Sequence, residues 1–207
     1  MINSLVERRA HAARIHSELS KLFPHAGMRL NFSNHWELVL AVSLSAQCTD
    51  KKVNEVTARL FKKYPTLDDY VRADLKEFEK DIFQTGFYHQ KAKNALAAAR
   101  VLQNRFGGVV PHTMDELMEL PGVGRKTANV VLGNAFGIAV GIAVDTHVRR
   151  LARVFGLTKH TDPEKIEQDL MKIIPQDQWF RTTYLYIEYG RRYCVARPHD
   201  HEKCPVK

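Results

Sequence analysis

Apolar residues recur along this chain at intervals of three and four, the spacing that places them on one face of an α-helix. The first such stripe follows Ser4 and Glu7, which have the spacing of a capping box, and it stops before Pro24. Its members are Ala12, Ile15, Leu19 and Leu22. A second segment, from about Trp36 to Ser45, is apolar on nearly every side, which predicts a helix enclosed by the core.

The rest of the chain continues in the same manner, with stripes separated by glycine, proline or N-cap residues. One helix is predicted after Thr49 or Asp50, with the stripe Val53, Val56, Leu60 and Phe61. The other helices are predicted over Leu67–Val71, Leu75–Ile82 and about His89–Arg105, after the Thr113–Glu116 capping pair, over about Arg125–Phe136, from Asp145, from Pro163 behind Asp162, and over about Gln178–Arg192. No two segments alternate convincingly enough to pair as strands, so the sequence predicts an all-α fold.

The 207 residues carry a formal net charge of +8, with 44% hydrophobic and 26% charged residues. These proportions are ordinary for a globular protein, whereas the excess of positive charge favours a polyanionic partner.

The chain has no apolar run long enough to span a membrane and no apolar signal-peptide core near its start, so we expect a cytoplasmic protein. Three cysteines, Cys48, Cys194 and Cys204, are too few and too unevenly numbered for a disulfide framework.

The segment Leu120–Ala128 is the most informative part of the chain, and it predicts two helices joined by a tight hairpin. Gly122 and Gly124 flank one apolar residue, and the absence of a Cβ lets the backbone turn sharply and approach a ligand. The helix that follows presents free N–H groups and the positive end of its dipole, which together suit a phosphate. An ordinary helix C-cap followed by a turn is the alternative interpretation.

Lys126 lies just inside the second helix of this hairpin. It could be a solvated surface lysine or a nucleophile. A nucleophilic amine must lose its proton, and the positive end of a helix dipole favours that loss. Further along, Asp145 begins another helix behind the apolar lead-in Ile142–Val144. An N-cap is the ordinary role of such an aspartate, and a carboxylate fixed there could also stabilise a developing cation or relay a proton.

Taken together, Leu120–Ala128 and Val144–His147 resemble the helix-hairpin-helix and catalytic loop of the endonuclease III family of DNA glycosylases. Three further segments are similar to motifs of the same family, in the same order along nearly the whole chain. They are Ser43–Asp50 (Leu-Ser-Ala-Gln-x-Thr-Asp), Gly86–Tyr88 before Lys91-Ala92 (Gly-Leu/Phe-Tyr) and Tyr189–Arg191 (His-Gly-Arg).

The resemblance implies two helical domains with a DNA-binding cleft between them. Residues 28–137 would form a six-helix barrel, with the helix-hairpin-helix at about 115–136. Residues 1–27 and 138–207 would form the second domain from both ends of the chain.

The resemblance also implies roles for single residues. Lys126 matches the nucleophile that attacks C1′ of a flipped-out damaged nucleotide, and Asp145 matches the carboxylate that assists. Gln47 matches the residue that fills the gap left by the flipped base, and Phe87 matches an apolar wedge, although without the resemblance a helix-end polar residue and a core aromatic would be the simpler interpretations. The remaining DNA contacts implied are Gly122, Val123, Gly124, Arg125 and Thr127.

Many family members close with Cys-x6-Cys-x2-Cys-x5-Cys around a [4Fe–4S] cluster. Here Cys194 and Cys204 fit the first and third places, His201 stands at the second, and the fourth lies beyond Lys207. Because thiolates normally supply all four ligands, we expect no stable cluster and assign no metal ligand. Two alternatives remain: a cluster-free basic loop that faces DNA through Arg191, Arg192, Arg197 and Lys203, or a zinc ion held by Cys194, His199, His201 and Cys204.

The sequence is therefore interpreted as a bifunctional DNA glycosylase and abasic-site lyase of base-excision repair. The expected substrate is double-stranded DNA with damaged bases, oxidised pyrimidines above all, or with abasic sites, and the protein is expected to act as a monomer. Two alternatives are an adenine-type monofunctional glycosylase, which generally lacks the lysine, and a non-catalytic helix-hairpin-helix DNA-binding protein, which would leave Lys126 and Asp145 without a role.

Overall fold

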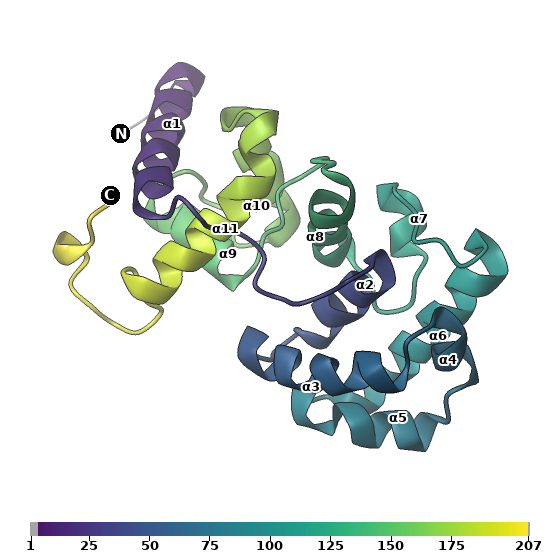
Figure 1. The fold of residues 1–207 in the computed structure, drawn as a ribbon. Helices are drawn as coiled ribbons and strands as arrows, with labels where there is room; N and C mark the ends of the chain where they lie inside the picture. Colours follow the sequence, from purple (N-terminus) through teal and green to yellow (C-terminus); the bar gives the residue numbers. More distant parts are fainter. Residues whose placement is uncertain (1–3, 207) are drawn as a thin grey trace. The chain divides into compact units, whose positions relative to one another are not determined.

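The computed structural model describes residues 4–206, and every regular element in this range is helical (Figure 1). This confirms the all-α fold class. Backbone contacts divide the chain into two compact units, one made of Met1–Met28 with Ala139–Lys207 and the other of Arg29–Ile138. Among the described residues, no helix combines the length and the apolar character needed to cross a bilayer.

The unit Arg29–Ile138 is built around one enclosed helix, α2 (His35–Leu44), most of whose residues are buried. Around it lie α3 (Asp50–Lys63), α4 (Leu67–Arg72), α5 (Leu75–Ile82), the short 3-10 helix η1 (Phe83–Thr85), α6 (Tyr88–Phe106), α7 (Met114–Met118) and α8 (Arg125–Phe136). Helix α2 contacts α3, α6 and α8. It is apolar on all sides because all of its sides face other helices.

The other unit combines α1 (Leu5–Leu22) with α9 (Thr146–Val154), α10 (Pro163–Ile173), α11 (Gln176–Arg192) and the 3-10 helix η2 (His201–Lys203). Their apolar faces share one core, to which the C-terminal segment adds Cys204 and Val206. The buried Tyr189 hydroxyl donates to the carbonyl of Val206 at 2.6 Å and accepts from its N–H at 3.0 Å. Helix α11 thereby holds the last described residues against the core.

Local signals in the sequence account for most helix ends. The capping box of Ser4 and Glu7 is present, with both reciprocal bonds formed. Thr113 also caps its helix by accepting from the N–H of Glu116, but the carboxylate of Glu116 accepts from the Thr113 hydroxyl instead of completing a box. The structure places Thr49, not Asp50, at the N-cap of α3.

Three details differ from expectation. Helix α6 begins one residue early, at Tyr88, and α11 begins at Gln176, because Pro175 supplies its N-cap position. On α3, Phe61 is only half-buried, and Thr57 lies in the core instead. The buried stripe turns with the 3.6-residue helical period, which favours Thr57, one turn after Val53, over Phe61.

Candidate functional site

The predicted hairpin joins α7 to α8, and its apolar residues Leu120 and Val123 are buried. The N–H of Val123 donates to the carbonyl of Leu120 at 2.9 Å, which closes the turn. Gly122 has φ +84°, and a Cβ built on it would lie 2.8 Å from the side-chain nitrogen of Asn94. Gly122 is therefore required both by its backbone conformation and by the space around it.

Gly124 differs from Gly122 on both counts. Its φ of −96° is ordinary, and a Cβ added to it would meet no atom within 4 Å. Gly124 is the N-cap of α8, and no side chain caps this helix, which also has no acidic residue in its first turn. By contrast, side-chain oxygens cap α1–α5, α7, α9 and α10. The start of α8 thus offers open room and a positive dipole end to an external anion.

The first turn of α8 carries Arg125, Lys126 and Thr127. Lys126 is exposed, while Arg125 and Thr127 are half-buried. The amine of Lys126 is accordingly accessible to a large ligand at the same helix end that Gly124 leaves open.

Asp145 is the N-cap of α9, and its Oδ1 accepts from the N–H of Val148 at 2.8 Å. The capping role inferred from the sequence is present. The segment Ile142–Val144 that leads into α9 is buried, and two hydrogen bonds hold it in place. The N–H of Ile142 donates to the carboxylate of Glu167, and the hydroxyl of Thr183 donates to the carbonyl of Ala143. Asp145 is half-buried and belongs to the unit formed from both chain ends, whereas Lys126 belongs to the other unit.

Gln47 and Phe87 share an unusual backbone conformation, with φ of +53° and +48°. They are the only non-glycine residues with positive φ in the described part of the chain, and such conformations cost on the order of 1 kcal/mol or more each. Phe87 is 68% exposed and Gln47 is exposed as well. The core-aromatic interpretation of Phe87 is therefore wrong, because the αL conformation at the start of α6 turns its ring toward solvent.

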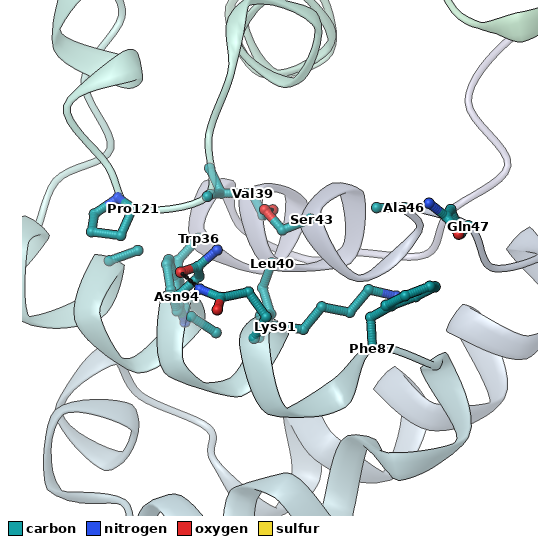
Figure 2. Close-up of a pocket in the computed structure, with 14 residues that line it drawn as sticks. Trp36, Val39, Leu40, Ser43, Ala46, Gln47, Phe87, Lys91, Asn94 and Pro121 are labelled. Carbon is teal, nitrogen blue, oxygen red and sulfur yellow. Dashed lines mark hydrogen bonds between the residues drawn. The ribbon is translucent and has the colours of Figure 1, made fainter.

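A pocket of about 260 Å³ connects these two residues with the hairpin. Its lining is mainly apolar side chains of α2 and α6, with Gln47 and Phe87 toward one end and Pro121 toward the other (Figure 2), and it includes Gly122. Three predicted site residues, Gln47, Phe87 and Gly122, thus border one concave surface of the unit Arg29–Ile138.

Lys91 is a functional candidate to which the sequence analysis assigned no role. Its Nζ donates to the carbonyl of Leu44, at the end of α2, and to the carbonyl of Thr85, at the end of η1, both at 2.7 Å. Burial lowers the pKa of the Lys91 amine from its ordinary value. One ammonium group therefore ties together the two turns that carry Gln47 and Phe87, and its side chain extends along the pocket toward them (Figure 2).

The C-terminal segment brings together four side chains that could hold a metal ion. The ligand atoms of Cys194, His199, His201 and Cys204 all lie within 4.8 Å of one another. The two cysteines are buried, while the histidines lie nearer the surface. The sequence places these residues over an interval of eleven positions, but only the folded loop shows that they converge.

Comparison with known proteins supports a specific relationship. Residues 40–176 match the model of the HhH-GPD superfamily base excision DNA repair proteins. The endonuclease III of Synechocystis is 47% identical over 95% of this chain and 90% of its own length, and that of Bacillus subtilis is 44% identical over 91% and 86%. The solved structure of a trapped endonuclease III–DNA covalent intermediate matches with a TM-score of 0.91 and 45% identity, covering 96% of this chain and 93% of the other.

Proposed function

The chain belongs to the endonuclease III family of base-excision DNA repair proteins, and from that premise we propose that Lys126 is its nucleophile and Asp145 the assisting carboxylate. The protein is a DNA N-glycosylase and abasic-site lyase, and it binds damaged DNA. One observation carries the assignment of the nucleophile. Lys126 stands exposed in the first turn of α8, behind the glycine hairpin, in a chain 45% identical to one that was trapped covalently on DNA.

The proposed reaction begins when the uncharged amine of Lys126 attacks C1′ of the damaged nucleotide, and the base departs with the electron pair of its glycosidic bond. The C1′–O4′ bond then breaks as Nζ gives up a proton and O4′ takes one up, which opens the sugar ring and leaves an imine between Nζ and C1′. Removal of a proton from C2′ expels the 3′ phosphate by β-elimination, which cuts the strand on the 3′ side. Hydrolysis of the imine finally releases the amine.

Asp145 would stabilise the positive charge that develops on the sugar and relay the proton from the attacking amine. Its bond to the N–H of Val148 suits both tasks, because it holds the carboxylate in one orientation. The cap and the catalytic role therefore reinforce each other.

The proposed DNA contacts divide into two groups. Gly122, Val123, Gly124, Arg125 and Thr127 would hold a backbone phosphate at the open start of α8, a contact that carries no sequence information. Gln47 would fill the gap left by the flipped base and Phe87 would press against the remaining stack. Their exposure, and the strained backbone that presents both side chains, support this second assignment.

The proposed substrate is double-stranded DNA that contains an oxidised pyrimidine or an abasic site, processed by the monomer. A panel of duplexes, each with one lesion, tests the substrate class, because excision should be fastest for the oxidised pyrimidines. Equal or faster excision of adenine from a mismatch would overturn that part of the proposal.

Borohydride trapping tests the nucleophile. The wild-type protein should form a covalent adduct with abasic-site DNA after reduction. The control variant Lys62→Ala, which loses an exposed lysine on α3 of the same unit, should form this adduct as well. Lys126→Ala should form none while still binding the duplex. An adduct of normal yield with Lys126→Ala would assign the nucleophile elsewhere.

A further inference from the structure

The metal centre common in this family does not fit the C-terminal segment of this chain. A [4Fe–4S] cluster normally takes four thiolates, and the segment offers two, Cys194 and Cys204. The remaining cysteine, Cys48, belongs to the other unit. The two other donors at the site are imidazoles, so a different group has to be considered.

We propose that Cys194, His199, His201 and Cys204 bind one zinc ion. Two thiolates and two imidazoles form a standard ligand set of structural zinc sites, in which the metal is tetrahedral and four-coordinate. With four protein ligands no position is left open for substrate. The ion is therefore structural, and the catalytic proposal does not depend on it.

The distances between the donors suit such a site. Cys194 Sγ lies 3.7 Å from His201 Nδ1, and Cys204 Sγ lies 3.4 Å from His199 Nε2. Tetrahedral zinc, with bonds of about 2.3 Å to sulfur and about 2.0 Å to nitrogen, places sulfur and nitrogen ligands about 3.5 Å apart. The other pairs, within 4.8 Å, need only small side-chain rotations to close around the ion.

The hydrogen bonds around the histidine and cysteine ligands match those expected beside a metal. His199 Nδ1 lies 2.8 Å from the carbonyl of Arg197, which can only accept, so Nδ1 carries the proton. The lone pair is then on Nε2, the atom that faces Cys204. Arg150 donates from Nη1 to Cys194 Sγ at 3.4 Å and so helps to fix the position of this sulfur. Partners of this kind orient ligands and raise metal affinity.

Backbone hydrogen bonds hold both cysteines in place. Cys194 directly follows the end of α11, and its N–H donates to the carbonyl of Tyr189. Cys204 ends η2, and Val206 beyond it is held by the Tyr189 hydroxyl. Zn²⁺ with two thiolates and two neutral imidazoles has no net charge, so the assembled site can lie against the apolar core of this unit.

The site would also order a basic surface. Ala196, inside the loop between the ligands, borders a pocket with Arg149, Arg150 and Arg153 of α9. Zinc would fix the segment from 194 to 204 beside these arginines. Loss of the zinc ion should therefore loosen this loop and lower the melting temperature of the unit that contains it. Lys126 belongs to the other unit and should still form its adduct with abasic-site DNA.

Metal analysis of the untagged full chain, purified without chelator, tests the proposal. We expect about one zinc per chain and no iron or acid-labile sulfide. After zinc is removed with a chelator, Co²⁺ should give the intense visible bands of a tetrahedral thiolate site. Iron with labile sulfide, or metal far below one per chain together with no cobalt spectrum, would overturn it.

Ligand variants locate the site. His199→Gln, at a half-buried loop position, should lower zinc affinity by more than about tenfold, and Cys204→Ser should abolish the sulfur-to-cobalt charge-transfer band. Cys48→Ser and His160→Gln, which change residues outside the cluster, should leave metal content unchanged. Wild-type zinc affinity in both ligand variants would refute the assignment.

Discussion

The amide group of Asn94 occupies the space that a Cβ on Gly122 would need, with Nδ2 2.8 Å from that position. Asn94 is held there by Gln90, whose Nε2 donates to Asn94 Oδ1 at 2.7 Å. No such neighbour stands near Gly124. The two glycines of the hairpin therefore serve different purposes: Gly122 allows the chain to fold, and Gly124 leaves room for what binds.

Substitution of each glycine by alanine should separate these purposes. Gly122→Ala forces a side chain into positive φ and against Asn94, and should lower the free energy of unfolding by about 2 kcal/mol or more. Gly124→Ala meets no atom and should cost less than about 1 kcal/mol as an N-cap change, yet weaken binding to abasic-site DNA. Denaturant titration and fluorescence anisotropy measure the two effects. Unchanged DNA affinity in Gly124→Ala would argue against a phosphate at the start of α8.

Asp145→Asn should keep the fold and lose turnover. Asparagine caps a helix as well as aspartate does, so the melting temperature should hardly change, whereas loss of the negative charge should slow excision by about a hundredfold or more. Asp145→Ala should in addition lose about 1 kcal/mol of stability. The experiment pairs single-turnover kinetics with thermal unfolding. Normal turnover in Asp145→Asn would show that Asp145 serves only as the N-cap of α9.

Lys91→Met should loosen both turns that flank the pocket. The change leaves the carbonyls of Leu44 and Thr85 without their shared donor and should cost about 1–3 kcal/mol. Amide exchange should rise around Gln47 and Phe87, and affinity for damaged DNA should fall. Lys93→Met, at an exposed position of the same helix α6, is the matched control. If exchange around both turns stayed at the wild-type rate, Lys91 would not be what joins them.

The unit built from both chain ends should lose stability on mild acidification because of His16. Burial, with a further contribution from the Arg181 guanidinium, lowers the pKa of His16 below 6.5, and its buried Nε2 has no hydrogen-bond partner among the described residues. Since the unfolded chain then binds the proton more tightly, the free energy of unfolding should fall as the pH drops from about 6.5 toward the lowered value.

The control for this effect is a pair of variants. His16→Gln should flatten the pH dependence, while His25→Gln, at an exposed position, should leave it as in wild type. Thermal unfolding between pH 5 and pH 8 provides the measurement. A steep acid loss that survives in His16→Gln would have another origin.

Local chemistry made much of the fold predictable. The capping box at Ser4 and the caps at Thr113, Asp145 and Asp162 act within four residues, so the sequence shows them directly, and it narrows the cap of α3 to Thr49 or Asp50. The wholly apolar helix α2 was predictable for a related reason, because its composition matches only a fully enclosed position.

Features that depend on distant residues could not be found in this way. The exposure of Phe87 follows from an αL backbone that no local pattern requires, and sequence alone favours the core for an aromatic residue. Lys91 acts through carbonyls 6 and 47 residues away, which no spacing rule connects. For His199 and His201 the sequence offers zinc binding only as one of two alternatives, and the folded loop adds the observation that their ring nitrogens converge with the two buried thiols.

The division of the chain also bears on its biosynthesis. Residues 29–138 form a contiguous unit, which can assemble as soon as α8 has left the ribosome. Helix α1 is translated before this unit, but its packing partners α10 and α11 are translated after it, and the Tyr189 hydroxyl finds its partner only when Val206 arrives. The apolar stripe of α1 therefore stays uncovered while residues 29–138 are synthesised, and its own unit can complete a core only after that interval.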